Sequence, residues 1–189
     1  MTSIGIETEI KLAVASAAAG RAALRRAGFR VSKRRVFERN TVFDTPARTL
    51  GKAGCLLRIR RAGRVVTLTY KGPPDVSRHK SREEVEQEIA GARAITAIVG
   101  RLGFEPVFRY EKYRTEYRQP PGGGMATLDE TPIGVYLELE GAPRWIDRAA
   151  RQLGFTESQY ITASYAGLYF AWCGRRGIEP SHMVYRNEA

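Results

Sequence analysis

Three charged residues near the start of the chain stand two positions apart, at Glu7, Glu9 and Lys11. A β-strand turns alternate side chains to opposite faces, so these three would share one face, with neighbours about 6.5–7 Å apart. The residues between and around them, Ile6, Thr8 and Ile10, would occupy the other face. Two carboxylates beside an ammonium group predict a site that holds a cation and an anion together.

The same spacing recurs in five further segments that carry other charges. These rows are Arg58 and Arg60; Thr67, Thr69 and Lys71; Arg82, Glu84, Glu86 and Glu88; Lys112, Arg114 and Glu116; Glu138 and Glu140. A single row of this kind fits the solvent-facing side of an antiparallel sheet. However, like charges stand together within single strands, and the polar positions are nearly all ionic. Such neighbours repel one another and bring no packing benefit.

A closed sheet would bring these rows around one lumen. About eight strands enclose a space that side chains just fill, or that holds one small ligand. Charges placed there must be paired or neutralised by a ligand and a metal. Carboxylate oxygens suit Mg²⁺, and Arg and Lys suit phosphoryl oxygens. The sequence contains no GxxxxGK[ST] or GxGxxG loop, so side chains would hold the phosphates of a metal–polyphosphate site.

The elements that position these rows follow from turn and cap signals. Helix-favouring runs cover about 15–27, 91–102, 144–153 and 163–173, and each of the first three ends in glycine followed by phenylalanine, a typical helix C-cap. Counting a strand near 30–39, about eight mostly antiparallel strands fill the remainder. We expect one α+β domain over 1–173 and a loose or draped tail over 174–189.

Composition limits the class of protein. The 189 residues are 43% hydrophobic and carry a net charge of +11, which favours a polyanionic partner: nucleic acid, an acidic membrane surface or a phosphorylated small molecule. No apolar run approaches the roughly 20 residues of a membrane span, and no signal peptide is evident, so we expect a cytoplasmic protein. Cys55 and Cys173 are expected as reduced thiols. A zinc site is not expected, because His79 and His182 are isolated.

The charged rows also match a known family. Glu7-x-Glu9-x-Lys11 resembles the signature of the CYTH superfamily, the triphosphate tunnel metalloenzymes, which include class IV adenylyl cyclases, thiamine triphosphatases and inorganic tripolyphosphatases. The similarity continues in order through Phe43-Asp44-Thr45-Pro46, Leu57-Arg58-Ile59-Arg60, Thr69-Tyr70-Lys71-Gly72, Arg82-Glu83-Glu84-Val85-Glu86, Lys112-Tyr113-Arg114, Leu128-Asp129, Leu137-Glu138-Leu139-Glu140 and Ser164-Tyr165-Ala166-Gly167-Leu168. This resemblance implies an eight-stranded antiparallel barrel that forms a triphosphate tunnel, with helices packed outside.

The resemblance also implies roles for individual residues. The metal ligands, for Mg²⁺ or Mn²⁺, would be Glu7, Glu9, Glu138 and Glu140, with Asp129 as an addition. The phosphate-binding set would be Lys11, Arg58, Arg60, Lys71, Arg82, Lys112 and Arg114, of which Lys11, Lys71, Lys112 and Arg114 would be catalytic. Glu84 and Glu86 match a further acidic pair that could hold water, a second metal or the basic residues themselves.

Three functions are consistent with such a tunnel. The favoured one is a metal-dependent phosphohydrolase that cleaves a small-molecule triphosphate. The first alternative is a class IV adenylyl cyclase that converts ATP to cyclic AMP and pyrophosphate. The second is a noncatalytic module that binds polyphosphate or RNA ends, and nucleic acid is otherwise not expected except as a 5′-triphosphate end. A homodimer is left open.

Overall fold

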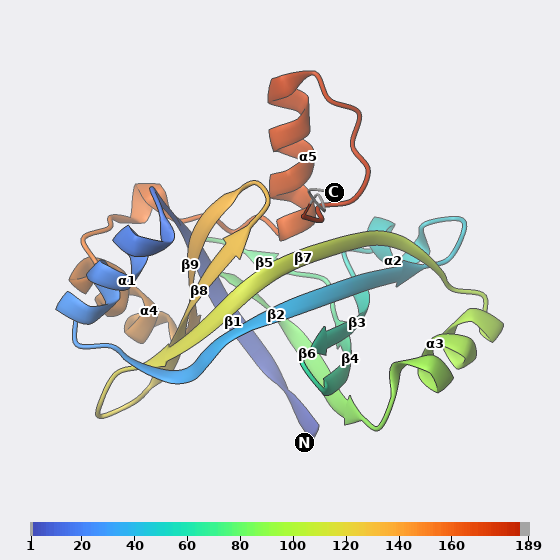
Figure 1. Cartoon of the computed structure of the whole chain (residues 1–189), viewed down its shortest axis with the longest axis horizontal. Helices are drawn as coiled ribbons and strands as arrows, with labels where there is room; N and C mark the ends of the chain where they lie inside the picture. The colour runs from blue at the N-terminus through green and yellow to red at the C-terminus, as the bar shows by residue number, and fades with distance from the viewer. Residues whose placement is uncertain (1, 186–189) are drawn as a thin grey trace.

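Eight antiparallel strands close into a barrel in the computed structural model, which describes residues 2–185 (Figure 1). The strands are β1 (Thr2–Val14), β2 (Arg30–Asp44), β3 (Leu56–Ala62), β4 (Val65–Lys71), β6 (Lys80–Ile89), β7 (Glu105–Arg118), β8 (Gly124–Thr131) and β9 (Gly134–Gly141). Their order around the barrel is β1-β9-β8-β7-β2-β3-β4-β6, and β6 pairs with β1 to close it. A short ninth strand, β5 (Asp75–Val76), pairs with β6. The predicted eight-stranded antiparallel barrel is confirmed.

Five α-helices among residues 2–185 pack around the barrel. They are α1 (Ala17–Arg26), α2 (Thr49–Lys52), α3 (Ala92–Arg101), α4 (Pro143–Gln152) and α5 (Tyr165–Arg176). In Figure 1, α1 and α4 lie together at one end of the molecule, α3 lies at the opposite end, and α5 stands over the middle. After α1, α3 and α4 the chain turns at Gly28, Gly103 and Gly154, whose φ angles of 82°, 90° and 89° favour glycine.

The hydrophobic core lies outside the barrel wall, between the sheet and its helices. One cluster, under α1 and α4, includes Leu12, Leu128 and Ile146, all of which are fully buried. A second cluster, which includes Val99 of α3 and Ile59 of β3, buries the outer face at the other end. Because most buried apolar side chains in these two clusters turn outward to the helices, the charged residues that alternate with them turn into the barrel.

The C-terminal segment follows β7 instead of hanging free. Helix α5 continues to Arg176, three residues beyond the expected helix end. Met183 is buried, and its backbone exchanges hydrogen bonds with the backbone of Arg109 and Glu111 on β7. The last four residues of the expected tail, 186–189, lie outside the described part of the chain.

Two other sequence expectations can be compared with this fold. Cys55 and Cys173 are both free thiols, as expected. Among residues 2–185, no helix is both long enough and apolar enough to cross a membrane.

Candidate functional site

The charged rows meet around a cavity of about 530 Å³ inside the barrel. Among residues 2–185, ten basic and eight acidic side chains line it: Lys11, Lys33, Arg58, Arg60, Lys71, Lys80, Arg82, Lys112, Arg114 and Arg118; Glu7, Glu9, Glu84, Glu86, Glu88, Glu116, Glu138 and Glu140. Every site residue expected from the sequence lines this cavity except Asp129. The structure therefore brings the predicted rows together in one lumen.

Strand register explains how residues distant in sequence become neighbours. Across β1 and β9, Lys11 stands opposite Glu138 and Glu9 stands opposite Glu140. Across β1 and β6, Glu7 stands opposite Arg82. Opposite residues of an antiparallel pair have Cβ atoms about 4.5–5.5 Å apart. On β1 the inward residues Glu7, Glu9 and Lys11 each stand opposite a charged residue of a neighbouring strand.

Two glutamates of β1 are each held by lysines. The Lys71 Nζ lies 2.5 Å from Glu7 Oε2 and 3.1 Å from Glu84 Oε2. Glu9 Oε1 accepts hydrogen bonds from Lys80 Nζ at 2.9 Å and from Lys11 Nζ at 3.2 Å. These side chains are buried or nearly so, which makes their pairing strong compared with surface ion pairs.

Lys80 is a cavity residue that the sequence analysis missed. It is 4% exposed, and burial, together with Lys11 and Arg82 nearby, lowers its pKa despite the contact with Glu9. A signal was present, since Lys80 stands two positions before Arg82 and continues the β6 row. The sequence analysis began this row at Arg82, because the residues before it were expected to form a polar loop.

The acidic pair on β6 holds basic residues in this structure. Glu84 contacts Lys71, and both Glu86 carboxylate oxygens accept from Arg60 Nη2, at 2.9 and 3.1 Å. Arg58 donates to the Tyr110 hydroxyl at 3.1 Å and to the Thr69 hydroxyl at 3.2 Å. Of the three roles expected for this pair, the geometry favours partners of the basic residues.

Asp129 does not line the cavity, and its carboxylate already accepts four hydrogen bonds. It is fully buried, and Arg114 Nε donates to its Oδ1 at 2.7 Å. Its Oδ2 accepts from Arg114 Nη2 at 2.6 Å, Lys112 Nζ at 2.8 Å and the Tyr165 hydroxyl at 2.6 Å. Burial would raise the Asp129 pKa, but Arg114 and Lys112 outweigh it and lower the pKa. Asp129 therefore orients Lys112 and Arg114, and its geometry does not suit the metal-ligand role expected from the resemblance.

The remaining four glutamates match the donor chemistry of a hard divalent cation. Burial and the neighbouring carboxylates of Glu7 and Glu138 raise the pKa of Glu140 to about 7. No lysine or arginine among the described residues approaches Glu140 within ion-pair distance. A cation beside Glu140 would relieve this repulsion, so the donor set fits a metal. Within residues 2–185 no three His, Cys, Asp or Glu side chains already surround one point, because Glu7, Glu9 and Glu138 are turned to cations.

Three further inward residues were not expected. Glu38 is 2% exposed, and although burial works in the opposite direction, Lys112 and Arg114 lower its pKa. Asn40, on the same strand, is also 2% exposed. The Tyr165 ring of α5 lies over two cavity lysines, 4.8 Å from Lys112 Nζ and 5.3 Å from Lys11 Nζ. No repeating charge marks these positions, which is why the row pattern did not reveal them.

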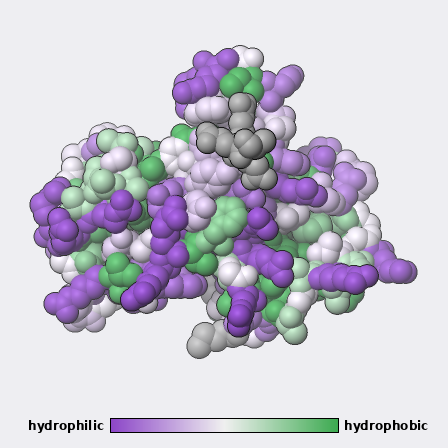
Figure 2. Space-filling view, in the orientation of Figure 1, coloured by the Kyte–Doolittle hydropathy of each residue, from purple (hydrophilic) through white to green (hydrophobic). Residues whose placement is uncertain are grey.

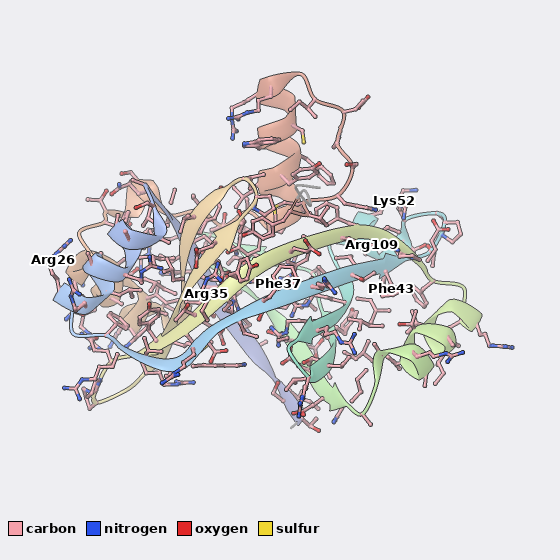
Figure 3. The ribbon with its side chains drawn as sticks, in the orientation of Figure 1. Arg26, Arg35, Phe37, Phe43, Lys52 and Arg109 are labelled. Carbon is pink, nitrogen blue, oxygen red and sulfur yellow. The ribbon has the colours of Figure 1, made fainter. Side chains whose placement is uncertain are left out.

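Part of the positive excess lies outside the cavity. Many hydrophilic side chains lie on the outer face that Figure 2 shows. Arg35 and Phe37, both on β2, are labelled in Figure 3. The Arg35 guanidinium stacks 3.5 Å from the Tyr113 ring centre and forms an ion pair with Glu130. Arg39 lies over Phe37 at 5.2 Å. Arg35 and Arg39 therefore form their contacts on the outer surface of the barrel and do not line the cavity.

Comparison with known proteins agrees with this geometry. The model of the CYTH domain family matches residues 5–165. A protein of Methanocaldococcus jannaschii named "Putative adenylate cyclase MJ0240" is 31% identical over 136 residues, which cover 71% of this chain and 76% of that protein. The solved structure of the PH1819 protein from Pyrococcus horikoshii has 28% identity and a TM-score of 0.72, covering 87% of this chain and 98% of its own. HpAC1 from Hippeastrum, at 21% identity and a TM-score of 0.61, covers 92% and 97% and shares the fold.

Proposed function

Because this chain belongs to the CYTH family, we propose that it is a metal-dependent phosphohydrolase that cleaves a small-molecule triphosphate inside the barrel. The observation that carries this proposal is the composition of the cavity wall, which has ten basic and eight acidic side chains among the described residues. Inorganic tripolyphosphate and organic triphosphates both present the oxygens that such a wall binds.

The charge balance of the wall supports metal dependence. Glu38 and Asp129 contact the same cations without lining the cavity, and counting them makes ten acidic groups against ten basic ones within residues 2–185. A wall that is neutral overall cannot by itself compensate a bound polyanion. The substrate is therefore expected to enter together with a divalent cation. Glu7, Glu9, Glu138 and Glu140 would hold this cation, which when bound neutralises phosphoryl oxygens and orients the substrate.

The basic residues act by exchanging partners. In the structure Lys71, Lys11 and Lys112 are paired with carboxylates, at 2.5, 3.2 and 2.8 Å. As a triphosphate enters, these ammonium groups would turn to its oxygens. They would then stabilise the charge that develops on the transferred phosphoryl group and on the leaving phosphate. Arg114, fixed by Asp129, would be positioned for the same task with little reorganisation.

The proposed reaction is an in-line displacement at phosphorus. A water oxygen forms a bond to the terminal phosphorus, the bridging P–O bond breaks, and the remaining diphosphate leaves with the electron pair of that bond. The proton lost by water passes to solvent or to a cavity carboxylate. HpAC1, a "putative adenylyl cyclase" that shares the fold, is described as having a dominant triphosphatase activity, and this supports the hydrolase over the cyclase.

An adenylyl cyclase is the second candidate. It is supported by the name of the Methanocaldococcus relative. It is also supported by apolar and aromatic cavity residues beneath α5, which include Val42, Phe108 and Tyr110 and could contact a base. In this reaction the ribose 3′-hydroxyl forms the new bond to the α-phosphorus, and pyrophosphate leaves.

One incubation series tests both candidates. Tripolyphosphate, thiamine triphosphate and ATP are each incubated with the protein and Mg²⁺ or Mn²⁺, with EDTA as the metal-free control. Orthophosphate release that depends on the metal supports the phosphohydrolase. Cyclic AMP and pyrophosphate from ATP would instead establish the cyclase. Binding without any product, and without a metal requirement, would overturn both in favour of a polyphosphate- or RNA-end-binding module.

A further inference from the structure

The amide of Asn40 is a buried polar group with no partner. Asn40 is 2% exposed, and neither its Nδ2 nor its Oδ1 has a hydrogen bond among residues 2–185. It contributes two of the unpaired buried side-chain atoms, more than any other described residue. Leaving a buried polar group unsatisfied destabilises the folded state, because the group loses its hydrogen bonds to water and gains none in return. A fold that retains such a group calls for an explanation.

Asn40 lies on the inner face of β2, next to the residues that line the cavity but not itself among them. On β2 its neighbours two positions away are Glu38, which faces Lys112 across the lumen wall, and Val42, which lines the cavity. Strand alternation places Asn40 on the same face as both. Its partners in register are Arg60 on β3 and Tyr110 on β7, and both of these line the cavity.

The cations around Asn40 are engaged on either side and do not bond its amide. Arg60 reaches across to Glu86 at 2.9 Å. Lys112 turns the opposite way, to Asp129 at 2.8 Å. Arg58 donates to Tyr110 and Thr69. Asn40 therefore lies between diverging phosphate-binding side chains, at a point where a bound phosphoryl group would meet several of them.

From this arrangement we infer that Asn40 is a substrate-binding residue, whose Nδ2 donates a hydrogen bond to a non-bridging phosphoryl oxygen of the triphosphate. This inference rests on the proposed function. The chemistry differs from that of the cations in one respect. Lys11, Lys71 and Lys112 must each give up a carboxylate partner before they bind phosphate, whereas the Asn40 amide has no partner to lose. The full value of its hydrogen bond to an anion is then available for binding.

Replacement by leucine separates this role from a structural one. Asn40→Leu keeps a similar side-chain volume and removes both unpaired polar atoms. We expect its melting temperature without ligand to equal or exceed that of the parent protein. Its affinity for tripolyphosphate with Mg²⁺, measured by titration calorimetry, should fall about 10-fold or more, because a hydrogen bond to a charged group is lost. Thr41→Val, next on β2 with its side chain on the outer face, is the matched control and should change neither quantity.

The outcomes decide the inference separately from the function. If the parent protein does not bind tripolyphosphate, the proposed function fails. If the parent binds and Asn40→Leu binds within threefold of it, the amide does not contact the substrate and the inference is overturned. If Asn40→Leu does not fold, Asn40→Ala replaces it, and an affinity within threefold of the parent's overturns the inference.

Discussion

Arg114 is joined to Asp129 by two hydrogen bonds, from Nε to Oδ1 at 2.7 Å and from Nη2 to Oδ2 at 2.6 Å. The two residues stand opposite each other across β7 and β8, and Asp129 is fully buried. Such a bidentate pair fixes the plane and position of the guanidinium group. The carboxylate thus holds Arg114, a proposed phosphate-binding cation, in one orientation before any ligand arrives.

Asp129→Asn is therefore expected to act on stability first. The amide keeps the shape of the side chain but leaves Arg114 and Lys112 without their main negative partner. Breaking one side of a buried ion pair lowers the free energy of unfolding by about 3–5 kcal/mol, which urea denaturation would measure. Glu130→Gln, next on β8 and paired with the half-exposed Arg35, is the control and should cost no more than about 1 kcal/mol. A stable Asp129→Asn protein that has lost only its response to Mg²⁺ would instead identify Asp129 as a metal ligand.

Glu138→Gln, in contrast, should reduce turnover and leave the fold intact. Although burial opposes it, Lys11 and Arg114 hold the pKa of Glu138 well below its usual range, so the residue is a carboxylate at neutral pH. The fold is expected to persist, because Lys11 retains its ion pair with Glu9 and Arg114 retains its ion pair with Asp129. Metal-dependent turnover should be almost abolished, as measured by orthophosphate release over a range of Mg²⁺ concentrations, with circular dichroism to confirm folding. A variant with the parent's rate of turnover would show that Glu138 is not a metal ligand.

Strand alternation was enough to predict which charged residues share a face, as Glu7, Glu9 and Lys11 do. The closed barrel that turns these faces toward one lumen was predicted from the resemblance to the CYTH superfamily. Spacing does not give register, however. The pairing of Asp129 with Arg114 depends on how β7 aligns with β8, and this alignment turned an expected metal ligand into a partner of cations.

Residues that do not repeat escaped the same reasoning. Asn40 is uncharged and adds nothing to a pattern of charges, although its burial makes it conspicuous in three dimensions. The segment after α5 has no periodicity, and its contact with β7 through Met183 depends on tertiary packing. The charge pattern therefore predicted most of the charged residues that line the cavity. Neutral residues such as Asn40 could be identified only from the structure.

Glu140 should make stability depend on pH. Its pKa is raised from 4.5 to about 7, so between these values the folded protein keeps a proton that the unfolded chain has lost. Stability contributed by this group is therefore lost as the pH rises, by up to about 1.4 kcal/mol per unit within that window. Glu140→Gln should raise the metal-free melting temperature by several degrees at pH 8 and by much less at pH 5. The measurement is made in EDTA, and a variant equal to or less stable than the parent at pH 8 would show that the carboxylate is not under repulsion.

Tripolyphosphate and Mg²⁺ together should stabilise the folded protein more than the sum of each alone. The wall is neutral when Glu38 and Asp129 are counted, so either ligand by itself brings uncompensated charge into the lumen. At a concentration 100 times the dissociation constant, a ligand of the folded state contributes about 2.7 kcal/mol, which corresponds to roughly 5–11 °C for a protein of this size. Differential scanning fluorimetry would measure the shift.

Arg39→Gln removes an exposed arginine of the outer face, and its melting temperature should rise as much as that of the parent protein. Lys71→Gln should lose most of the rise. A shift that Arg39→Gln abolishes and Lys71→Gln retains would move phosphate binding from the tunnel to the outer surface.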